Sequence, residues 1–425
     1  MIENLAIRFN GISTLTSLST NLQNNTIQQI HSFASLFYLV YCRKFDITMF
    51  INYTMIVYFK EFNMNEVVNK KLSTFTRILR ALGFYSEKWL LKLLFFALII
   101  VTLLLYFWSI PSLYFNLPLM WLKISGSILF ALAAPAALII LKPKRRIFFI
   151  ISALVIAITL WQQSIPPSND RDWKLSVAKL PNVSIDGNIV KIANIRNFDY
   201  RSATDFTPRY YSKTFNLDNI QSLDYILSYW DGNKAIAHTI LSFGFKNDNY
   251  LAVSVETRLS KGQKQTFLSG IFNQYELIYI LADERDILRL RSNFRKEEVY
   301  LYRVKSNPAI LKKAFTEVIQ QASNLQKQPR FYNTLKHNCF TTLLADLRRA
   351  QGKEYHFDHR YIMNGYSDKM LYDKNVLISG GMPFEKLKKR RHINQYVEND
   401  PNAEINFSRK IRPLGSGMQN PKQKK

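Results

Sequence analysis

Three long runs of apolar residues are the strongest pattern along the chain. Residues 93–110 and 124–141 are 18-residue runs without a charge, and residues 147–163 contain only uncharged polar side chains among the apolar ones. A helix of about 20 apolar residues crosses the roughly 30 Å hydrocarbon core of a bilayer. The pattern therefore predicts a bundle of three transmembrane α-helices rather than buried core helices. Tryptophans stand near the ends of the runs, as they do at membrane interfaces: Trp89, Trp108, Trp121 and Trp161.

The charges around these runs predict their orientation. Basic residues precede the first run and separate the second from the third, whereas the loop 109–118 carries no charge. Because basic loops remain in the cytoplasm, we expect a cytoplasmic amino terminus. Three crossings of a bacterial inner membrane then place everything after Ser164 in the periplasm. The basic residues are Lys70, Lys71, Arg77, Arg80, Lys88 and Lys92, followed by Lys142, Lys144, Arg145 and Arg146.

Residues 1–63 fit this arrangement poorly, because their apolar stretches are weak and broken by charges, with no signal-peptide pattern. We expect a mis-assigned translation start, with the true start at Met64. Residues 64–163 then form the membrane region and 164–184 a linker. The periplasmic domain covers 185–380, and 381–425 is a basic carboxy-terminal tail.

The periplasmic part combines strand and helix patterns. Period-two alternation predicts strands at 235–245 and 250–258, and residues 190–195, 276–282 and 299–304 also read as strands. Residues 246–249 read as the loop of a hairpin, and 217–229 as a helix-like or irregular segment. Apolar residues at helical spacing predict helices at 309–325 and 339–350. Strands and helices that are mixed rather than regularly alternating indicate an α+β fold.

Cys339 stands where the second of these helices begins. Asn338 is a good N-cap, and the following apolar residues recur at helical spacing. A thiol in the first turn lies on unsatisfied N–H groups and the positive end of the helix dipole, which stabilise the nucleophilic thiolate. The alternative is a small buried hydrophobe. Cys339 is one of two cysteines in the chain, so an internal disulfide of the domain is excluded in an oxidising compartment and catalysis is one reason for a free thiol.

His238 and Glu256 lie on the two strands of the predicted hairpin. Across a four-residue loop His238 pairs near Glu256 or Arg258. A histidine oriented by a carboxylate is the base that a cysteine nucleophile requires. A satisfied structural histidine is the alternative, but together with Cys339 and the predicted compartment we favour catalysis by Cys339, His238 and Glu256.

The net charge of +26 needs a partner other than nucleic acid, because a periplasmic domain meets none and no recognition motif is present. A basic surface tethered to a membrane faces anionic phospholipid headgroups, unless it is simply a solvated tail. Arg285 and Arg291, in the charged segment 283–295, are candidates for a lipid phosphate or carboxylate, and a solvated helix face is the alternative. Arg258 either binds substrate or pairs with Glu256.

Two further pairs of residues are candidate components of a site. Tyr332 and Asn333 line the cleft or are a packed aromatic and a turn residue. His356 and His359, with Glu354 and Asp358 nearby, are better read as a polar loop than as zinc ligands, because no third histidine or HExxH motif accompanies them. The domain contains no P-loop, GxGxxG or GxSxG motif. We expect no metal and no cofactor.

Five ordered blocks of residues 185–380 resemble the Lnb N-terminal periplasmic domain family. They are Ala237-His238-Thr239 with Ser242-Phe243-Gly244-Phe245; Val253-Ser254-Val255-Glu256-Thr257-Arg258; Asp283-Glu284-Arg285-Asp286 with Arg289-Leu290-Arg291; Tyr332-Asn333 with Asn338-Cys339-Phe340-Thr341-Thr342; and Gly365-Tyr366-Ser367-Asp368 with Leu371-Tyr372. The resemblance implies a circularly permuted papain-like fold, with Cys339 as nucleophile, His238 as base and Glu256 as candidate third group. The chain departs from the family in its leading membrane spans and in Phe340, which interrupts an Asn-Cys-Thr-Thr pattern.

The family's namesake is similar in role to a lipoprotein N-acyltransferase, which moves a fatty acyl chain to the amino terminus of a lipidated cysteine. The resemblance thus implies a thiol acyltransferase, with Cys339 attacking a phospholipid ester and Asn338 helping to stabilise the oxyanion. The alternatives are a thiol peptidase or amidase acting on peptidoglycan, and a non-catalytic envelope protein on the same fold. Expected partners are membrane phospholipid and either lipoproteins or peptidoglycan.

Overall fold

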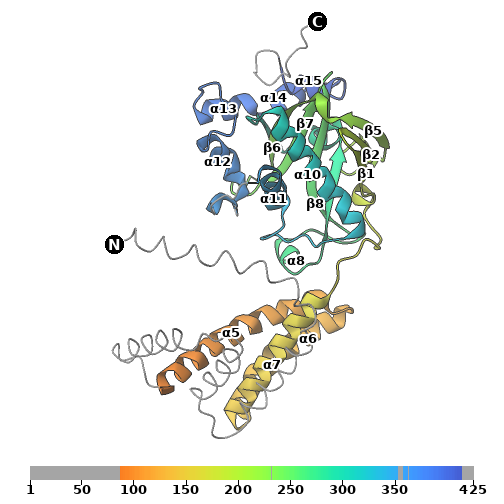
Figure 1. The fold of residues 1–425 in the computed structure, drawn as a ribbon. Helices are drawn as coiled ribbons and strands as arrows, with labels where there is room; N and C mark the ends of the chain where they lie inside the picture. The colour runs from red at the N-terminus through yellow and green to blue at the C-terminus, as the bar shows by residue number, and fades with distance from the viewer. Residues whose placement is uncertain (1–86, 231, 353–357, 362, 414–425) are drawn as a thin grey trace, which may run out of the picture. The chain divides into compact units, whose positions relative to one another are not determined.

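The computed structural model describes residues 87–230, 232–352, 358–361 and 363–413 (Figure 1). The predictions for residues 1–63, including the start at Met64, lie outside the described residues. The same holds for the basic residues before Glu87 and for Glu354 and His356.

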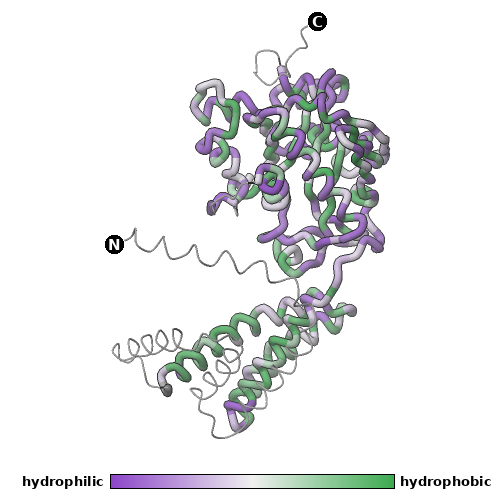
Figure 2. Tube along the Cα trace, viewed as in Figure 1, coloured by the Kyte–Doolittle hydropathy of each residue, from purple (hydrophilic) through white to green (hydrophobic). Residues whose placement is uncertain are grey.

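Three apolar helices precede the domain: α5 (Glu87–Asn116), α6 (Met120–Ile140) and α7 (Lys144–Ser164). Each is long and apolar enough to cross a membrane, with mean hydropathies of 2.7, 1.9 and 1.8 in their most apolar windows. Figure 2 shows the apolar character running along all three helices. Their apolar side chains are mostly exposed, as lipid-facing side chains are. The prediction of three apolar helices is confirmed.

Polar contacts join α5 and α7. Thr102 and Ser152 share a hydrogen bond between their hydroxyls of 2.9 Å, and Trp108 Nε1 donates to Gln162 Oε1 at 2.8 Å. Such side-chain hydrogen bonds between membrane helices satisfy polar groups that lipid cannot.

The domain is built on an eight-stranded mixed sheet with the order β1-β2-β9-β8-β7-β6-β10, and β5 pairs with β2. All neighbouring pairs are antiparallel except β2 with β9. The strands are β1 (Asn182–Asp186), β2 (Ile189–Arg196), β5 (Tyr210–Asn216), β6 (Ile220–Tyr229), β7 (His238–Phe245), β8 (Asn249–Arg258), β9 (Glu276–Ala282) and β10 (Glu298–Arg303), with a separate pair of β3 (Asp199–Tyr200) and β4 (Phe206–Thr207).

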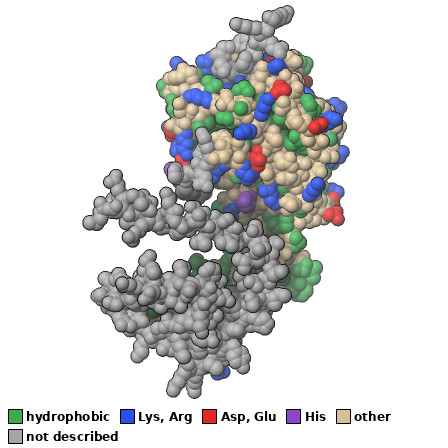
Figure 3. Space-filling model, in the orientation of Figure 1, with side chains coloured by type: hydrophobic (Ala, Val, Ile, Leu, Met, Phe, Trp, Pro, Cys, Tyr) green, Lys and Arg blue, Asp and Glu red, His purple; other side chains and the backbone are tan. Residues whose placement is uncertain are grey.

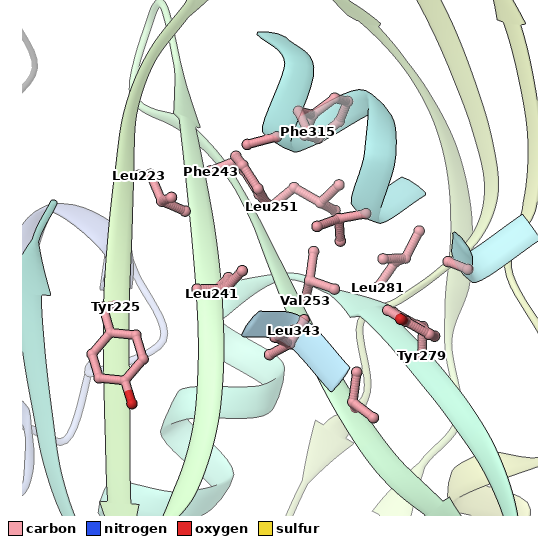
Figure 4. Packing of buried hydrophobic residues seen from close by; sticks show 14 of the residues in the cluster. Leu223, Tyr225, Leu241, Phe243, Leu251, Val253, Tyr279, Leu281, Phe315 and Leu343 are labelled. Atoms are coloured by element: carbon pink, nitrogen blue, oxygen red, sulfur yellow. The ribbon is translucent and has the colours of Figure 1, made fainter. Parts of the chain in front are cut away.

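Helices cover both faces of the sheet, so the domain has three layers. On one face α10 (Pro308–Lys327) and α11 (Cys339–Gln351) bury the larger core, whose centre is drawn in Figure 4. On the other face α9 (Glu284–Arg289), α14 (Asn394–Val397) and α15 (Phe407–Lys410) bury the second core. The remaining short elements are η2 (Leu175–Val177), η3 (Leu217–Asn219), α8 (Phe267–Ile271), η4 (Leu290–Phe294), η5 (His359–Tyr361), η6 (Asn364–Tyr366), α12 (Ser367–Asp373) and α13 (Phe384–Arg391).

The predicted α+β class is confirmed, and the predicted strands and helices appear within a few residues of their expected bounds. The interpretation of 217–229 as helix-like or irregular is wrong, because this segment forms η3 and strand β6. β6 lies between β7 and β10 and is buried on both faces. The polar residues of β6 are therefore buried like its apolar residues, and the two kinds do not alternate between a solvated and a buried face. Without that alternation the sequence shows no period-two pattern that would predict a strand.

Two charged segments are more buried than the sequence predicts. In the segment 283–295, Asp286 accepts hydrogen bonds from Arg196 and is fully buried, so the segment is not a solvated face. Residues 384–412 were expected within a basic tail, yet they pack on the domain with Leu387 and Ile411 fully buried. Figure 3 shows Lys and Arg scattered over one face of the domain, with acidic side chains between them.

Candidate active site around Cys339

The start of α11 is fixed by its cap. Asn338 Oδ1 accepts hydrogen bonds from the N–H groups of Phe340 and Thr341, at 3.0 and 2.9 Å, and Thr341 Oγ1 accepts from the Asn338 N–H at 3.0 Å. Asn338 Nδ2 donates to the Thr334 carbonyl at 3.0 Å. This reciprocal capping box satisfies the first turn. Both ends of the Asn338 amide form hydrogen bonds, so the structure gives Asn338 a capping role, and its predicted contact with an oxyanion stays a prediction.

The Cys339 thiol is buried against the start of β7. Its Sγ lies 4.0 Å from the carbonyl oxygen of Ala237 and 3.8 Å from Nδ2 of Asn364. Burial raises the pKa of the thiol above its ordinary value, although the N–H groups of Thr239 and Phe340 and the charge of Arg291 act in the opposite direction. The resting thiol is therefore protonated and needs a base to become a nucleophile.

His238 belongs to a hydrogen-bonded chain that ends on a carboxylate. His238 Nε2 and Ser254 Oγ are 2.6 Å apart, and Ser254 Oγ donates to Glu256 Oε1 at 3.0 Å. His238 Nε2 itself lies 3.8 Å from Glu256 Oε1. The predicted pairing of His238 with Glu256 therefore runs through a serine hydroxyl, which sequence reasoning did not single out.

Arg291 sets the charge of this chain. Its guanidinium donates to Glu256 Oε1 at 3.2 Å and to Glu297 Oε2 at 3.0 Å. Burial opposes ionisation of Glu256, but the neighbouring charges of Arg291 and His238 outweigh it and lower the pKa of Glu256 to about 2. Burial, and after it the charge of Arg291, lower the pKa of His238 to about 3. At neutral pH the ring is therefore neutral and the carboxylate ionised.

The structure brings the thiol beside the main chain of His238 without a hydrogen bond to its ring. Ala237 and Leu241 share the core of α11 with Cys339, whereas Ile240 lies in the core on the opposite face. Alternation along β7 directs the His238 ring toward that second face, at the first residue of the strand. Ring atom Nδ1 forms no hydrogen bond within the described part of the chain, and because the ring is directed toward the second face, it must turn before Nδ1 can reach the thiol.

Asn364 is the residue at the thiol that sequence reasoning missed. Its Oδ1 accepts from the Ala237 N–H at 3.0 Å, and its Nδ2 donates to the Ala237 carbonyl at 2.6 Å. The same Nδ2 faces Cys339 Sγ. Asn364 stands directly before Gly365-Tyr366-Ser367-Asp368, one of the blocks that resemble the family. This position is the feature of the sequence that could have indicated Asn364 as a site residue.

Gly365 explains how this segment approaches so closely. A Cβ at this position would lie 2.2 Å from the Lys234 carbonyl oxygen and 2.7 Å from the carbonyl carbon of Ala235. The Gly365 N–H donates to the Ala235 carbonyl at 3.0 Å. Only a residue without a side chain lets η6 lie against residues 234–236, and this contact carries Asn364 to the thiol.

The predicted substrate-binding arginines are engaged within the protein. Arg258 donates to the carbonyls of Val177 and Ala178, at 3.1 and 2.8 Å, and so attaches the linker 164–184 to β8. Arg285 donates to Asp199 at 3.2 Å. Arg291 holds Glu256 and Glu297, so it acts on the site through the carboxylates.

Tyr332 and Asn333, the two cleft candidates, also form contacts within the protein. Tyr332 is buried beside Cys339, whose N–H interacts with its hydroxyl, and burial raises the pKa of that phenol. Asn333 Oδ1 accepts from the N–H groups of Leu335 and Lys336, so it shapes the turn before α11. Within the described residues no group of three or more His, Cys, Asp or Glu could hold a metal ion.

The comparison with known families agrees with this geometry. Residues 206–365 match the family model described as the Lnb N-terminal periplasmic domain. This segment is similar to the domain that defines the family. The match contains His238, Glu256 and Cys339, and it ends at Gly365, the residue that docks Asn364. No curated protein and no solved structure matches the chain.

The family and the three apolar helices together describe a membrane protein that carries a periplasmic domain. The orientation of its termini, the permuted papain-like fold and the thiol chemistry remain predictions from the sequence.

Proposed function

We propose that this Lnb N-terminal periplasmic domain is a cysteine-dependent acyltransferase, which takes a fatty acyl chain from a phospholipid and passes it to the amino terminus of a lipoprotein. The observation that supports this most is the environment of Cys339. A thiol at a capped helix start lies beside β7, and the neutral His238 and the ionised Glu256 are linked through Ser254. This is the nucleophile, base and orienting group of thiol acyl transfer.

The first half-reaction forms a thioester. The His238 ring turns toward Cys339, Sγ attacks the ester carbonyl carbon while His238 Nδ1 takes the thiol proton, and the carbonyl electrons move to oxygen. Collapse of this intermediate breaks the C–O bond, and His238 returns the proton to the leaving alcohol oxygen. The Glu256 carboxylate stabilises the transient imidazolium through the Ser254 hydroxyl.

The second half-reaction releases the acyl group. The amine of the acceptor attacks the thioester carbonyl and His238 accepts a proton from the amine nitrogen. The C–S bond then breaks, and His238 passes this proton to the leaving sulfur, which regenerates the thiol. Two donors near Sγ, the Cys339 N–H and Asn364 Nδ2, stabilise the oxyanion of each step by exchanging their present acceptors, the Tyr332 hydroxyl and the Ala237 carbonyl. The membrane helices favour a lipid acyl donor, because its carbonyl lies at the interface to which the domain is tethered.

Intact-mass measurement of the full-length protein after incubation with phospholipid tests this proposal. We expect an added fatty-acyl mass that neutral hydroxylamine removes and that is absent from Cys339→Ser. A protein that stays unmodified, while its thiol still reacts with iodoacetamide and it releases fragments from peptidoglycan, would instead be an amidase. An unmodified protein with an inert thiol would indicate a non-catalytic domain.

A further inference from the structure

Exposed apolar side chains gather around the nucleophile. Among the described residues from Leu175 onward, eleven large apolar side chains are exposed. Six of them belong to the segments that contact Cys339 or its cap. A seventh, Trp230, follows Tyr229, whose hydroxyl donates to the Gly365 carbonyl, and four are distributed elsewhere. We call these seven the apolar rim: Trp230, Ile236, Phe267, Leu268, Leu335, Met363 and Tyr366.

Hydrogen bonds connect each part of the rim to the thiol. On one side α8 carries Phe267 and Leu268, and Thr334 donates from its hydroxyl to the Phe267 carbonyl at 3.1 Å. The Thr334 carbonyl in turn accepts from Asn338, the cap of the Cys339 helix. On the other side Ile236 precedes Ala237, whose carbonyl faces Sγ, and Met363 and Tyr366 flank the Asn364–Gly365 pair.

The linker from the membrane helices joins the domain at this same end of the sheet. Strand β7 begins at His238, β8 ends at Arg258 and β9 begins at Glu276. The antiparallel register places these three residues at the same end of the sheet. Glu276 Oε1 accepts a hydrogen bond of 3.2 Å from the N–H of Ser168, and Arg258 Nη1 donates to Asn169 Oδ1 at 2.9 Å.

This attachment limits how far the rim can lie from a bilayer. Helix α7 ends at Ser164, and only residues 165–167 separate it from Ser168. Four peptide steps at about 3.3–3.6 Å per residue reach about 14 Å at most. The attachment at Ser168 therefore lies no more than about 14 Å from the end of a helix that spans the hydrocarbon core, close to a headgroup region that is about 5–7 Å deep.

The charges beside the rim complement an anionic membrane surface. The segments 260–272 and 328–338 contain four basic residues and no Asp or Glu: Lys261, which pairs with Asp172, and Lys264, Arg330 and Lys336. Lys264 is exposed three residues before Phe267, and Lys336 is exposed directly after Leu335. Apolar side chains bordered by lysines are the pattern of an interfacial membrane contact, in which the apolar groups enter the acyl region and the lysines meet headgroups.

We infer that the apolar rim inserts into the outer leaflet of the membrane that anchors the chain and so places the entrance to Cys339 among lipid acyl chains. The inference deepens the proposed function, because it defines the acyl donor as a bilayer lipid reached without leaving the leaflet. The test of the inference does not require catalysis, so the inference and the proposed function can fail separately.

The experiment uses the full-length protein with Cys42→Ser and Cys339→Ser, reconstituted in vesicles of phosphatidylcholine and phosphatidylglycerol. Leu268→Cys and Leu335→Cys each receive a fluorescent label. Ile405→Cys is the matched control, because Ile405 is 55% exposed, as Leu268 is at 56%, and lies between α14 and α15, at the end of the domain away from α8 (Figure 1).

We expect brominated phospholipids to quench the labels at 268 and 335 and to leave the label at 405 unquenched. Lys264→Glu with Lys336→Glu reduces this quenching in vesicles rich in phosphatidylglycerol. Equal quenching at all three positions overturns the inference. Labels that are shielded from iodide but unaffected by brominated lipid also overturn it, because the rim is then covered by protein, either a second copy or another part of the chain.

Discussion

At the scale of single residues, the base of the proposed reaction is set by three partners acting in series. Arg291 holds Glu256, Glu256 accepts from Ser254, and Ser254 contacts Nε2 of His238. Because one ring nitrogen is engaged, the tautomer and orientation of the ring follow from the hydroxyl. Ser254 is thus a positioning residue, whose effect reaches the reaction through His238.

Ser254→Ala removes the link between the ring and the carboxylate. We expect acyl-enzyme formation to slow by about tenfold to a hundredfold, less than the roughly 10²–10⁴-fold expected on loss of the base itself. The rate is measured from intact mass over time. Ser254→Thr retains a hydroxyl and restores most of the rate. A fully active Ser254→Ala would remove the serine from the proposed chain.

The pKa values of His238 and Glu256 predict loss of stability in acid. The folded pKa of Glu256, about 2, is below its ordinary 4.5, so its contribution is complete above pH 4.5 and is lost as the pH falls toward 2. The folded pKa of His238, about 3, is below its ordinary 6.5. As the pH falls below 6.5 the unfolded chain therefore binds a proton that the folded protein does not bind, and the free energy of unfolding decreases.

Between pH 7 and 4 we expect the free energy of unfolding to fall by about 3 kcal/mol through His238. His238→Gln should flatten this part of the pH dependence, measured as the thermal midpoint of the full-length protein in detergent. A variant with the wild-type slope between pH 6.5 and 4 would show that the ring is not held neutral.

At the scale of elements, the site depends on the close approach of η6 to the residues before β7. Gly365→Ala places a methyl group on the Lys234 carbonyl oxygen, so η6 must move and Asn364 leaves the thiol. We expect a stability loss of about 1–3 kcal/mol and slower alkylation of Cys339 by iodoacetamide in a Cys42→Ser background.

Gly187→Asn is the matched control for this variant. Gly187 has a φ of +53° and open space around its Cα, and asparagine tolerates that backbone conformation. It should leave both the midpoint and the alkylation rate unchanged. Normal alkylation in Gly365→Ala would contradict the role assigned to Asn364.

At the scale of the whole molecule, the carboxy-terminal segment closes the second face of the sheet. Arg412 is fully buried and donates to Asp224 Oδ2 and Glu284 Oε2, each at 2.8 Å. Its guanidinium also lies 3.8 Å from the centre of the Tyr250 ring. This residue therefore joins β6, α9 and the end of the described chain in one ionic cluster.

Arg412→Met leaves the buried Glu284 carboxylate without its cation and leaves Asp224 paired with Arg303 but without Arg412. We expect the domain to lose about 3–5 kcal/mol of stability, measured by denaturant unfolding of the full-length protein in detergent. Arg409→Met is the control, because Arg409 forms an exposed ion pair with Asp248 and its loss should change little. Equal effects of the two substitutions would show that residues 394–412 do not stabilise the domain.

The sequence by itself determined the features that depend on local pattern. Three apolar runs predicted three apolar helices, because helix length and hydropathy suffice for that. Local strand patterns predicted β2, β7, β8, β9 and β10, and the Asn338 cap predicted the start of the Cys339 helix, since both are set by near neighbours. The order of short blocks identified the family that residues 206–365 match.

Only the tertiary structure decided which of these residues meet. Ser254 entered the His238–Glu256 pair because β7 and β8 place it between them, and Asn364 reached the thiol from over 100 residues beyond His238 in the sequence. Strand β6 and the 384–412 segment were misjudged for the same reason. Their polar and basic residues are satisfied by distant partners such as Asp224 and Glu284, and a linear pattern carries no information about such pairings.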